Sequence, residues 1–475
     1  MNPPLYTPFH TRRDPLILPD QSARIHALAK RILHEVGIEI KHAGVLARLQ
    51  QEGLRSSGER VFFDPVLVDE YVEEMRQVVA PWTHHSPAPN DGPLGLSVSS
   101  YSLYVHDLET GRVIPYSTER LIEMTKLIDT LADERVSGTP PGIPTEVHPD
   151  LQPVAQYRIA ALYARQGATP VDPTSAKTVN YLLDMAEVMG RPIDGLPVYV
   201  PTPLRLGGES LDVVLACLDR LEYISVTSMP SLGVSAPLQP FGALALAAAE
   251  VIGGMIAVKI ATGKPVTCHV DILPFDLRAG AMVFGSPENL LFQMLCADYN
   301  RFYGWGEEGG PGNIHVMAKL PDCQSASEKA SIMALGAALG AHHFSCAGTL
   351  SLDEIFSPEQ LLLDCEIRDW VQRAIQGVAL GEEDVQDWLK EIRLGIERGF
   401  MGRDSTLDHH KEHTWYPRWF QRGAAGQWFE KGEPKLSDRL QNEVRRRIAS
   451  HHFELDAERR REIERIYRQA ELAVG

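Results

Sequence analysis

Aromatic and acidic side chains are the residues of this chain best suited to binding a small cation. Trp305, Glu307 and Glu308 stand close together, after a short aromatic segment and before the glycine-rich GGPGN. An aromatic face attracts an ammonium ion by roughly 0.5 to 2 kcal/mol once water is excluded. Two adjacent carboxylates are costly to bury unless they serve a purpose. The cluster therefore predicts a site for a positively charged ligand.

A second group of candidate residues stands at the predicted carboxyl ends of strands or just beyond them. In a barrel of alternating strands and helices, such positions line the active site. The group is rich in aromatic residues and carboxylates and poor in lysine, which again suits a cation. Packing is the commoner role for any one aromatic residue, so we interpret the group as a whole. It includes Tyr101, Asp172, Tyr199, His269, Asp271, Phe344 and Thr349.

The segment DHHKEH raises a different possibility, a metal site. His409 and His413 are four residues apart and would share one face of a helix, where Asp408 or Glu412 could join them. The segment does not match H-E-x-x-H, and surface histidines are the commoner explanation. A metal-dependent barrel hydrolase therefore stays open as an alternative function, although no tightly bound metal is expected. No Walker loop, G-x-S-x-G elbow or Ser/His/Asp spacing is present.

The elements that must position these side chains alternate between strand-like and helix-period segments. About eight such units, spaced by roughly 25 to 45 residues, are the pattern of a (β/α)8 TIM barrel, an α/β fold. We predict an N-terminal helical layer over residues 1–95, the barrel over 96–381 and a C-terminal helical extension over 382–475. The predicted barrel strands end near His106, Pro140, Asp172, Pro203, Ser228, Val270, Trp305 and Ala347.

Composition excludes several classes of function. The net charge of -17 supplies no basic surface for a nucleic acid. The six cysteines are scattered without a C-x-x-C pair, which predicts free thiols instead of disulfides or a zinc ribbon. No apolar run of membrane-spanning length is expected. The opening MNPPLYTPFHTRRDP lacks the apolar region of a signal peptide, so we expect a cytoplasmic protein.

Several segments together resemble one known family. They are ILHEVGIEIKHAGVLARLQQEG, HDLETGRVIPYSTERL, VDILPFDLRAGAMVFGSPEN, AKLPDCQSASEKA, FSPEQLLLDCEI and HTWYPRWFQRGAAGQWFEKGEPKLSDR. In this order and spacing they resemble the trimethylamine methyltransferase family of corrinoid-dependent methyltransferases. The resemblance covers nearly the whole chain. It implies a TIM barrel that presents its substrate to a corrinoid (cobalamin) carried by a separate partner protein, whose cobalt(I) takes a methyl group.

Founding members of that family carry pyrrolysine after the seventh strand, whereas this chain has only standard residues between Gly309 and Lys319. Members without pyrrolysine are similar to glycine betaine methyltransferase, which demethylates a quaternary amine. Such a substrate already carries its charge, so it leaves as a neutral amine without an acid catalyst. The protein need only position the N-methyl group and exclude water. No residue is therefore predicted to act as acid, base or nucleophile.

A betaine substrate would also bring a carboxylate that needs a hydrogen-bond donor. Asn313, His315 and Arg301 are the candidate donors, and the sequence does not choose among them. We expect a homo-oligomer that uses neither nucleic acid nor membrane. A third possibility is a non-catalytic relative that only binds a small cation.

Overall fold

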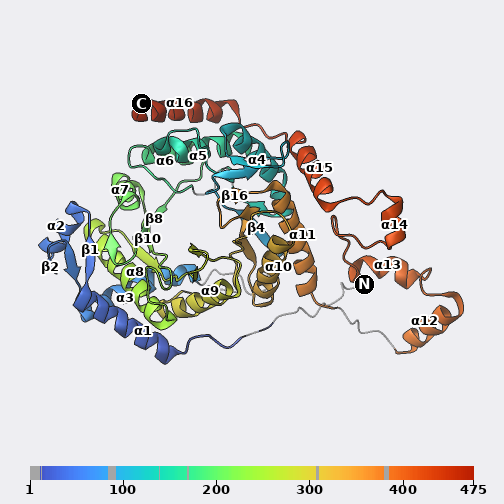
Figure 1. Cartoon of the computed structure of the whole chain (residues 1–475), viewed down its shortest axis with the longest axis horizontal. Coiled ribbons are helices and arrows are strands. Elements are labelled where there is room, and N and C mark those ends of the chain that lie inside the picture. The colour runs from blue at the N-terminus through green and yellow to red at the C-terminus, as the bar shows by residue number, and fades with distance from the viewer. Residues whose placement is uncertain are drawn as a thin grey trace.

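Parallel strands form the centre of the molecule and helices surround them (Figure 1). The computed structural model describes residues 11, 13–83, 92–138, 140–167, 171–305, 310–378 and 385–475. Two three-stranded parallel sheets have the orders β14-β4-β7 and β8-β10-β11, and a parallel bridge between Asn313 and Ser345 places another segment beside β14. These strands are β4 (Gly95–Val98), β7 (Val136–Ser137), β8 (Gly195–Tyr199), β10 (Tyr223–Thr227), β11 (Val266–His269) and β14 (His343–Ala347).

Helices alternate with these strands along the described chain. They are α4 (Thr118–Thr130), α5 (Gln152–Tyr163), α6 (Val179–Val188), α7 (Glu209–Ala216), α8 (Pro240–Thr262), α9 (Pro287–Asn300), α10 (Cys323–Ala338) and α11 (Pro358–Ile375). Ser286 and Ser357 cap α9 and α11, as their Ser-Pro starts predict, because each hydroxyl accepts a backbone N–H of the first turn. The fold is a (β/α)8 TIM barrel, which confirms the predicted class.

Two of the eight predicted barrel strands are wrong, and a third, ending near Asp172, is not confirmed: residues 171–175 form no strand, and residues 168–170 lie outside the described part of the chain. The segment ending at His106 is β5 (Tyr104–His106), which belongs to a separate sheet at the barrel edge, and β4 is the barrel strand instead. The segment before Trp305 is a 3-10 turn (Arg301–Tyr303) that continues α9. Tyr299 and Tyr303 are both fully buried and hydrogen-bonded through their hydroxyls at 2.8 Å, so helical spacing sets this packing.

Short strands in the loops around the barrel complete the sheet structure. The sheet at the barrel edge joins β5 to β6 (Val113–Pro115), β15 (Thr349–Leu350) and β16 (Ile355–Phe356). A separate hairpin joins β12 (Phe275–Asp276) to β13 (Ala281–Met282) between β11 and α9. Both groups follow the carboxyl ends of barrel strands, so they build the rim of the barrel mouth.

Helix α8 corrects the expectation that no apolar run reaches membrane-spanning length. It is 23 residues long with a mean hydropathy of 2.0, and 83% of its most apolar window is buried inside the protein. It packs against α1, α2, β10 and β11. Such burial is what a core helix of a barrel shows, and length and composition alone do not separate it from a membrane span.

The N-terminal layer contains a small sheet besides its helices. It comprises α1 (Pro19–Arg31), a π-helical turn (Ile32–Val36), β1 (Ile38–Ile40), α2 (Ala43–Gln51), β2 (Arg55–Ser57), β3 (Arg60–Phe62) and α3 (Pro65–Thr83). Gly37 ends the first helix with a φ of 73°, where a Cβ would lie 2.5 Å from the Val61 carbonyl oxygen. Strand β9 (Arg205–Leu206) pairs with β1 and ties this layer to the barrel.

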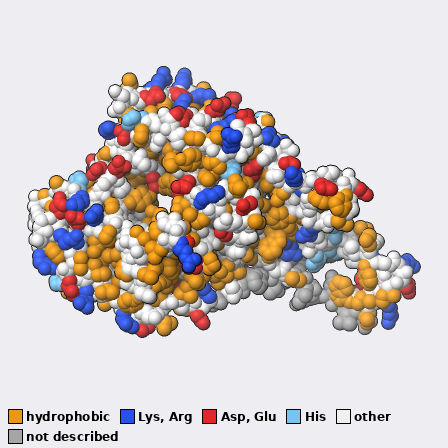
Figure 2. All heavy atoms as spheres, viewed as in Figure 1, with side chains coloured by type: hydrophobic (Ala, Val, Ile, Leu, Met, Phe, Trp, Pro, Cys, Tyr) orange, Lys and Arg blue, Asp and Glu red, His pale blue; other side chains and the backbone are white. Residues whose placement is uncertain are grey.

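The C-terminal extension is helical. Its elements are α12 (Val385–Arg398), α13 (Asp404–His413), α14 (Ala425–Glu430), α15 (Leu436–Ala449) and α16 (Ala457–Val474). Helix α15 packs on α4 and α11, and α16 packs on α5 and α6. Helix α12 lies on an arm away from the barrel (Figure 1), and apolar side chains are visible on that arm in Figure 2. The predicted domain limits at residues 95 and 381 stay predictions.

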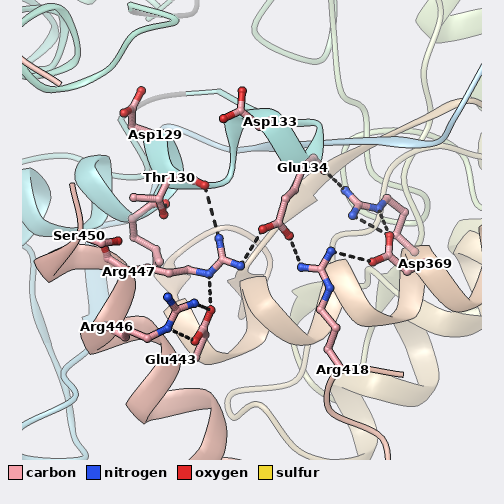
Figure 3. A network of polar contacts seen from close by, with 12 residues as sticks. Asp129, Thr130, Asp133, Glu134, Asp369, Arg418, Glu443, Arg446, Arg447 and Ser450 are labelled. Atoms are coloured by element: carbon pink, nitrogen blue, oxygen red, sulfur yellow. Dashed lines mark hydrogen bonds and ion pairs between the residues drawn. The ribbon is translucent and has the colours of Figure 1, made fainter. Parts of the chain in front are cut away.

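A network of ion pairs fastens this extension to the barrel (Figure 3). Glu134, in the turn after α4, accepts hydrogen bonds from Arg447 at 2.7 Å and from Arg418. Arg447 also donates to Glu443 at 2.8 Å, and Arg418 lies 3.8 Å from Asp369 of α11. The two arginines hold the pKa of Glu134 below its usual value against the opposing effect of partial burial. The charged form of Glu134 therefore stabilises the docked extension.

Candidate active site

The inner face of the barrel is less buried than the outer face of the same strands. On β8 and β10, Leu196, Val198, Ile224 and Val226 are buried in the core shared with α8. The alternating residues, which point inward, are half-buried or exposed. A TIM barrel normally fills its interior with packed branched side chains. Here the interior is polar and accessible to water, and its half-buried inward residues include Ser97, Ser225, Thr227 and Ser345.

Two glycines at the amino ends of barrel strands make room for large neighbours. Tyr223 lies across Gly195, its partner in the ladder, so that a Cβ on the glycine would meet the ring at 2.3 Å. His343 lies across Gly95 in the same way, at 2.9 Å, and its Nε2 pairs with the Ser97 hydroxyl at 2.9 Å. These side chains occupy the amino-terminal end of the interior. Space for a ligand therefore lies toward the carboxyl ends, where catalytic residues of such barrels occur.

Two tyrosines share one carboxylate at this end. The hydroxyls of Tyr101 and Tyr199 each donate a hydrogen bond to the same oxygen of Asp172, at 2.5 Å. Partial burial raises the pKa of both phenols well above the usual value, and the charge of Asp172 adds to this. Both phenols therefore stay protonated at neutral pH. Tyr101 and Tyr199 are 45% and 38% exposed, so two partly accessible aromatic residues share one carboxylate.

Trp305 belongs to a second aromatic and acidic group, at the end of β11. Its Nε1 donates to the Cys268 carbonyl at 2.9 Å, and its ring meets the His269 ring edge-on at 5.6 Å. Nδ1 of His269 lies 3.2 Å from a carboxylate oxygen of Asp271. The barrel mouth thus carries two separate pairings of aromatic rings with a carboxylate. Glu307 and Glu308 lie outside the residues that the structure describes.

The remaining predicted residues divide between the interior and the core. The side-chain oxygen of Asn313 accepts the backbone N–H of His315 at 3.0 Å, so it shapes its own turn. Both ring nitrogens of His315 are buried without a hydrogen-bond partner. Phe344 is fully buried and faces α10, and Thr349 is fully buried with its hydroxyl on the Cys346 carbonyl at 2.6 Å. The structure therefore does not bring Phe344 and Thr349 to the mouth.

The match with a family model extends over almost the whole chain. Residues 8–473 match the model described as trimethylamine methyltransferase (MTTB). The chain belongs to this family. The predicted family is thereby confirmed, and the chain is a methyltransferase.

Relatives within the trimethylamine methyltransferase family differ in the substrate that their names give. Glycine betaine methyltransferase of Desulfitobacterium hafniense (strain Y51) is 26% identical over 436 residues, which cover 87% of this chain and 88% of that protein. Trimethylamine methyltransferase MttB of Methanosarcina thermophila is 29% identical over 261 residues, or 54% of this chain and 52% of that one. The aligned region covers most of both chains only for the first of these two.

A solved structure, the hydroxylamine complex of MtmB, aligns with 92% of this chain and 89% of its own at 10% identity. The TM-score is 0.42, so the barrel assignment rests on the strand order described above.

The metal-site alternative finds no support among the described residues of this family member. No group of three or more His, Cys, Asp or Glu side chains within them is arranged to hold a metal ion. His409 instead contacts Glu412, with Nδ1 and Oε2 3.1 Å apart, on helix α13 of the C-terminal arm. Two surface hollows, beside α16 and on the N-terminal layer, contain none of the predicted site residues.

The inward hydroxyl groups are the part of the site that motif reasoning missed. Ser225 and Thr227 alternate with buried Ile224 and Val226 in the short run YISVT. This period of two was visible in the sequence, but such a pattern normally marks a strand with one face in solvent. A parallel barrel strand is usually apolar on both faces. The alternation was therefore a signal of a polar, half-buried inner face of the barrel.

Proposed function

We propose that this protein transfers a methyl group from a quaternary amine to the cobalt(I) of a corrinoid held by a partner protein. The observation that carries the proposal is the Tyr101–Asp172–Tyr199 cluster toward the carboxyl ends of the barrel strands. A quaternary ammonium cannot donate a hydrogen bond, so a protein recognises it through aromatic faces and an opposite charge. The two phenols fix the carboxylate in place and present their rings beside it.

The second cluster supports the same substrate class. Trp305, the residue type that binds cations best through its ring, stands near Asp271 with His269 between them. Each acid is half-buried or partly exposed, so each remains available to a ligand. A permanently charged methylated amine matches both groups better than a neutral molecule would.

The chemistry asks little of the protein beyond placement. The methyl group is taken from a quaternary nitrogen. The nitrogen that remains is a neutral tertiary amine, so it needs no proton from an acid. The corrinoid supplies the nucleophile that accepts the methyl group. The chain holds the cation with one N-methyl group directed outward and excludes water from the other faces.

The described side chains offer no competing nucleophile at the mouth. Of the cysteines, Cys323 alone is exposed, and it begins α10 outside the barrel interior. Burial raises the pKa of Cys268 and Cys346 to about 12, which keeps both thiols protonated and unreactive at neutral pH. Because the described residues include no reactive thiol at the mouth, the methyl acceptor is expected to come from a separate molecule.

Exposed apolar side chains around the mouth fit the docking of a partner protein. They lie in the loops that follow β10, β11 and the segment at Asn313, and their exposures range from 53% to 68%. Apolar residues exposed together on neighbouring loops are typical of protein contact surfaces. These residues are Met229, Val234, Leu238, Leu277 and Leu320. A corrinoid protein seated here would bring its cofactor over the cation site. The cytoplasmic location and homo-oligomeric state stay predictions.

The test is a methyl-transfer assay with the purified full-length chain and chemically reduced free cobalamin as acceptor. We expect a change in the cobalamin absorbance with at least one quaternary amine, together with the matching tertiary amine as product. Simple tertiary amines are expected to react more slowly. Tight binding of these cations without any methyl transfer would instead identify a cation-binding relative without catalysis. No transfer and no binding with any quaternary amine would refute the proposed function.

A further inference from the structure

Glu250 is a fully buried acid that the methyl transfer itself does not use. It lies in the middle of α8, and none of its surface is exposed. Acidic side chains are almost never fully buried unless they are paired, because an isolated buried charge is costly. Among the described residues, no lysine, arginine or histidine pairs with it. The carboxyl group is therefore held by neutral hydrogen-bonding groups.

One oxygen of Glu250 holds the turn that follows β8. This oxygen, Oε1, accepts the Thr202 hydroxyl at 2.7 Å and the Leu204 backbone N–H at 2.9 Å. Leu204 has a φ of 50°, a left-handed conformation that is uncommon for residues other than glycine. The two bonds therefore stabilise a turn that the local sequence does not favour.

The other oxygen of Glu250 faces the end of β10. This oxygen, Oε2, and the Ser228 hydroxyl oxygen are both buried, and neither has a hydrogen-bond partner among the described groups. Ser228 directly follows β10, and its hydroxyl lies close enough to the carboxyl group to affect the pKa of Glu250. One proton shared between these two oxygens would satisfy both.

Helix α8 comes close to both strands at this point. Gly254 stands one turn after Glu250, on the same face of the helix. A Cβ on this glycine would lie 3.0 Å from Val200 and from Val226. Val200 follows β8, and its N–H bonds to the Thr227 carbonyl of β10 at 2.8 Å. This face of α8 therefore packs against the carboxyl ends of β8 and β10.

We infer that Glu250 is a positioning residue for the cation site and that it acts as a neutral carboxylic acid. It joins the ends of β8 and β10, and Tyr199, the last residue of β8, donates its hydroxyl to Asp172 at 2.5 Å. This inference rests on the proposed function. A neutral acid accepts with one oxygen and donates with the other, which matches the two bonds at Oε1 and the unpaired Ser228 oxygen. Glu250 is shut off from solvent, so it acts through Tyr199 and not on the substrate.

The surroundings of Glu250 favour its protonated form. Burial raises the pKa of Glu250, and the hydrogen bonds from Leu204, Thr202 and Ser228 oppose this shift only in part. None of these three groups is charged. Charged side chains on the neighbouring elements bond to one another instead: Glu39 to Arg205 at 3.3 Å and Lys259 to Glu74 at 2.7 Å. The folded protein therefore retains a proton that the unfolded chain releases above the usual glutamate pKa.

The first test measures ligand binding by calorimetry on the full chain, with choline and its neutral isostere 3,3-dimethyl-1-butanol. Glu250→Gln keeps an acceptor and a donor in place, so it should bind choline as the unmodified chain does. Glu250→Leu removes both and should weaken choline binding about 2- to 30-fold, which is the contribution of one aromatic face to binding a cation. Thr202→Val should have a smaller effect in the same direction. Binding of the neutral alcohol should change less.

A second measurement tests the neutral form without any ligand. The folded pKa of Glu250 is raised, so the stability that its proton contributes is complete at acidic pH and decreases as pH rises toward the folded value. Glutamine has no such proton to lose. The melting temperature of Glu250→Gln, relative to that of the unmodified chain, should therefore rise between about pH 4 and pH 7. Parallel melting curves across this range would refute the neutral form.

Thr125→Val is the matched control, because Thr125 is a buried hydroxyl on α4 that bonds to the Leu121 carbonyl of its own helix at 2.7 Å. It should leave choline binding unchanged. Lost choline binding in a folded Glu250→Gln, or normal choline binding in a folded Glu250→Leu and Thr202→Val, would overturn the inference while the cation site stands. If Glu250→Leu does not fold, Thr202→Val alone gives the answer. No binding of any quaternary ammonium to the unmodified chain would overturn the proposed function and this role of Glu250 together, whereas the melting curves would still test its protonation.

Discussion

Replacing Asp172 with asparagine tests the cation site directly. The change keeps the size of the side chain and an oxygen for the two tyrosine hydroxyls, which now lie 2.5 Å from one carboxylate oxygen. It removes only the negative charge. Two unit charges roughly 5 Å apart attract by about 3 kcal/mol at an effective dielectric constant of about 20. We therefore expect Asp172→Asn to weaken binding of tetramethylammonium about 100-fold.

The assay must separate charge from shape. Choline and its neutral isostere 3,3-dimethyl-1-butanol have nearly the same outline, so calorimetry with both isolates the effect of the positive charge. In Asp172→Asn the affinity for choline should fall while that for the neutral alcohol stays nearly constant. Measurements at about 0.1 M salt limit screening, since the Debye length there is about 10 Å.

Asp271→Asn is the matched control, because Asp271 is the other carboxylate at the mouth and pairs with His269. We expect this variant to weaken choline binding by a smaller factor. Equal loss of choline and the neutral alcohol in Asp172→Asn would point to a disturbed pocket instead of a lost charge. A full effect in Asp271→Asn and none in Asp172→Asn would refute our placement of the cation.

Three further predictions concern the barrel, the extension and the rim. Gly195→Ala should lower the free energy of unfolding by about 1 to 3 kcal/mol in urea titrations, because the new Cβ meets the Tyr223 ring at 2.3 Å. Adding Tyr223→Ala to the same chain should remove this clash, so Gly195→Ala should then cost less. Glu134→Gln should cost about 1 to 3 kcal/mol at neutral pH. The pKa of Glu134 is lowered in the folded state, so its contribution is present above the usual glutamate pKa and is lost as pH falls through the folded value; melting curves from pH 3 to 8 should converge at the acidic end. Leu238→Asp with Leu277→Asp should slow methyl transfer to a protein-bound corrinoid at least 10-fold, whereas transfer to free cobalamin should remain unchanged, as initial rates would show.

Local signals predicted several elements closely. The Ser-Pro pairs at Ser286 and Ser357 begin α9 and α11, because a capping hydroxyl and a proline act within one helical turn. Gly37 marks the end of the first helical segment, where its φ of 73° suits glycine. These features depend on neighbours in the chain, so no knowledge of the tertiary fold was needed.

The aromatic run before Trp305 misled the strand prediction for a different reason. Phe302 and Tyr303 have strong preferences for strands, yet here they extend α9 in a short turn. Tertiary packing decided the outcome, since Tyr303 is fully buried and its hydroxyl meets both Tyr299 and His26. The segment at Asn313, which pairs with β14, takes the place of the predicted seventh barrel strand.

The sequence by itself determined which residue types make up the site and to which family the chain belongs. Aromatic residues and carboxylates at strand ends, with few lysines, already indicated a cationic ligand. Only the tertiary structure decided which of them meet. Asp172 is 71 residues from Tyr101 and 27 from Tyr199, and closure of the barrel brings the three together. Phe344 faces the core instead, because the alternation along β14 turns it outward, and no spacing in the sequence states which face of a strand lies inside.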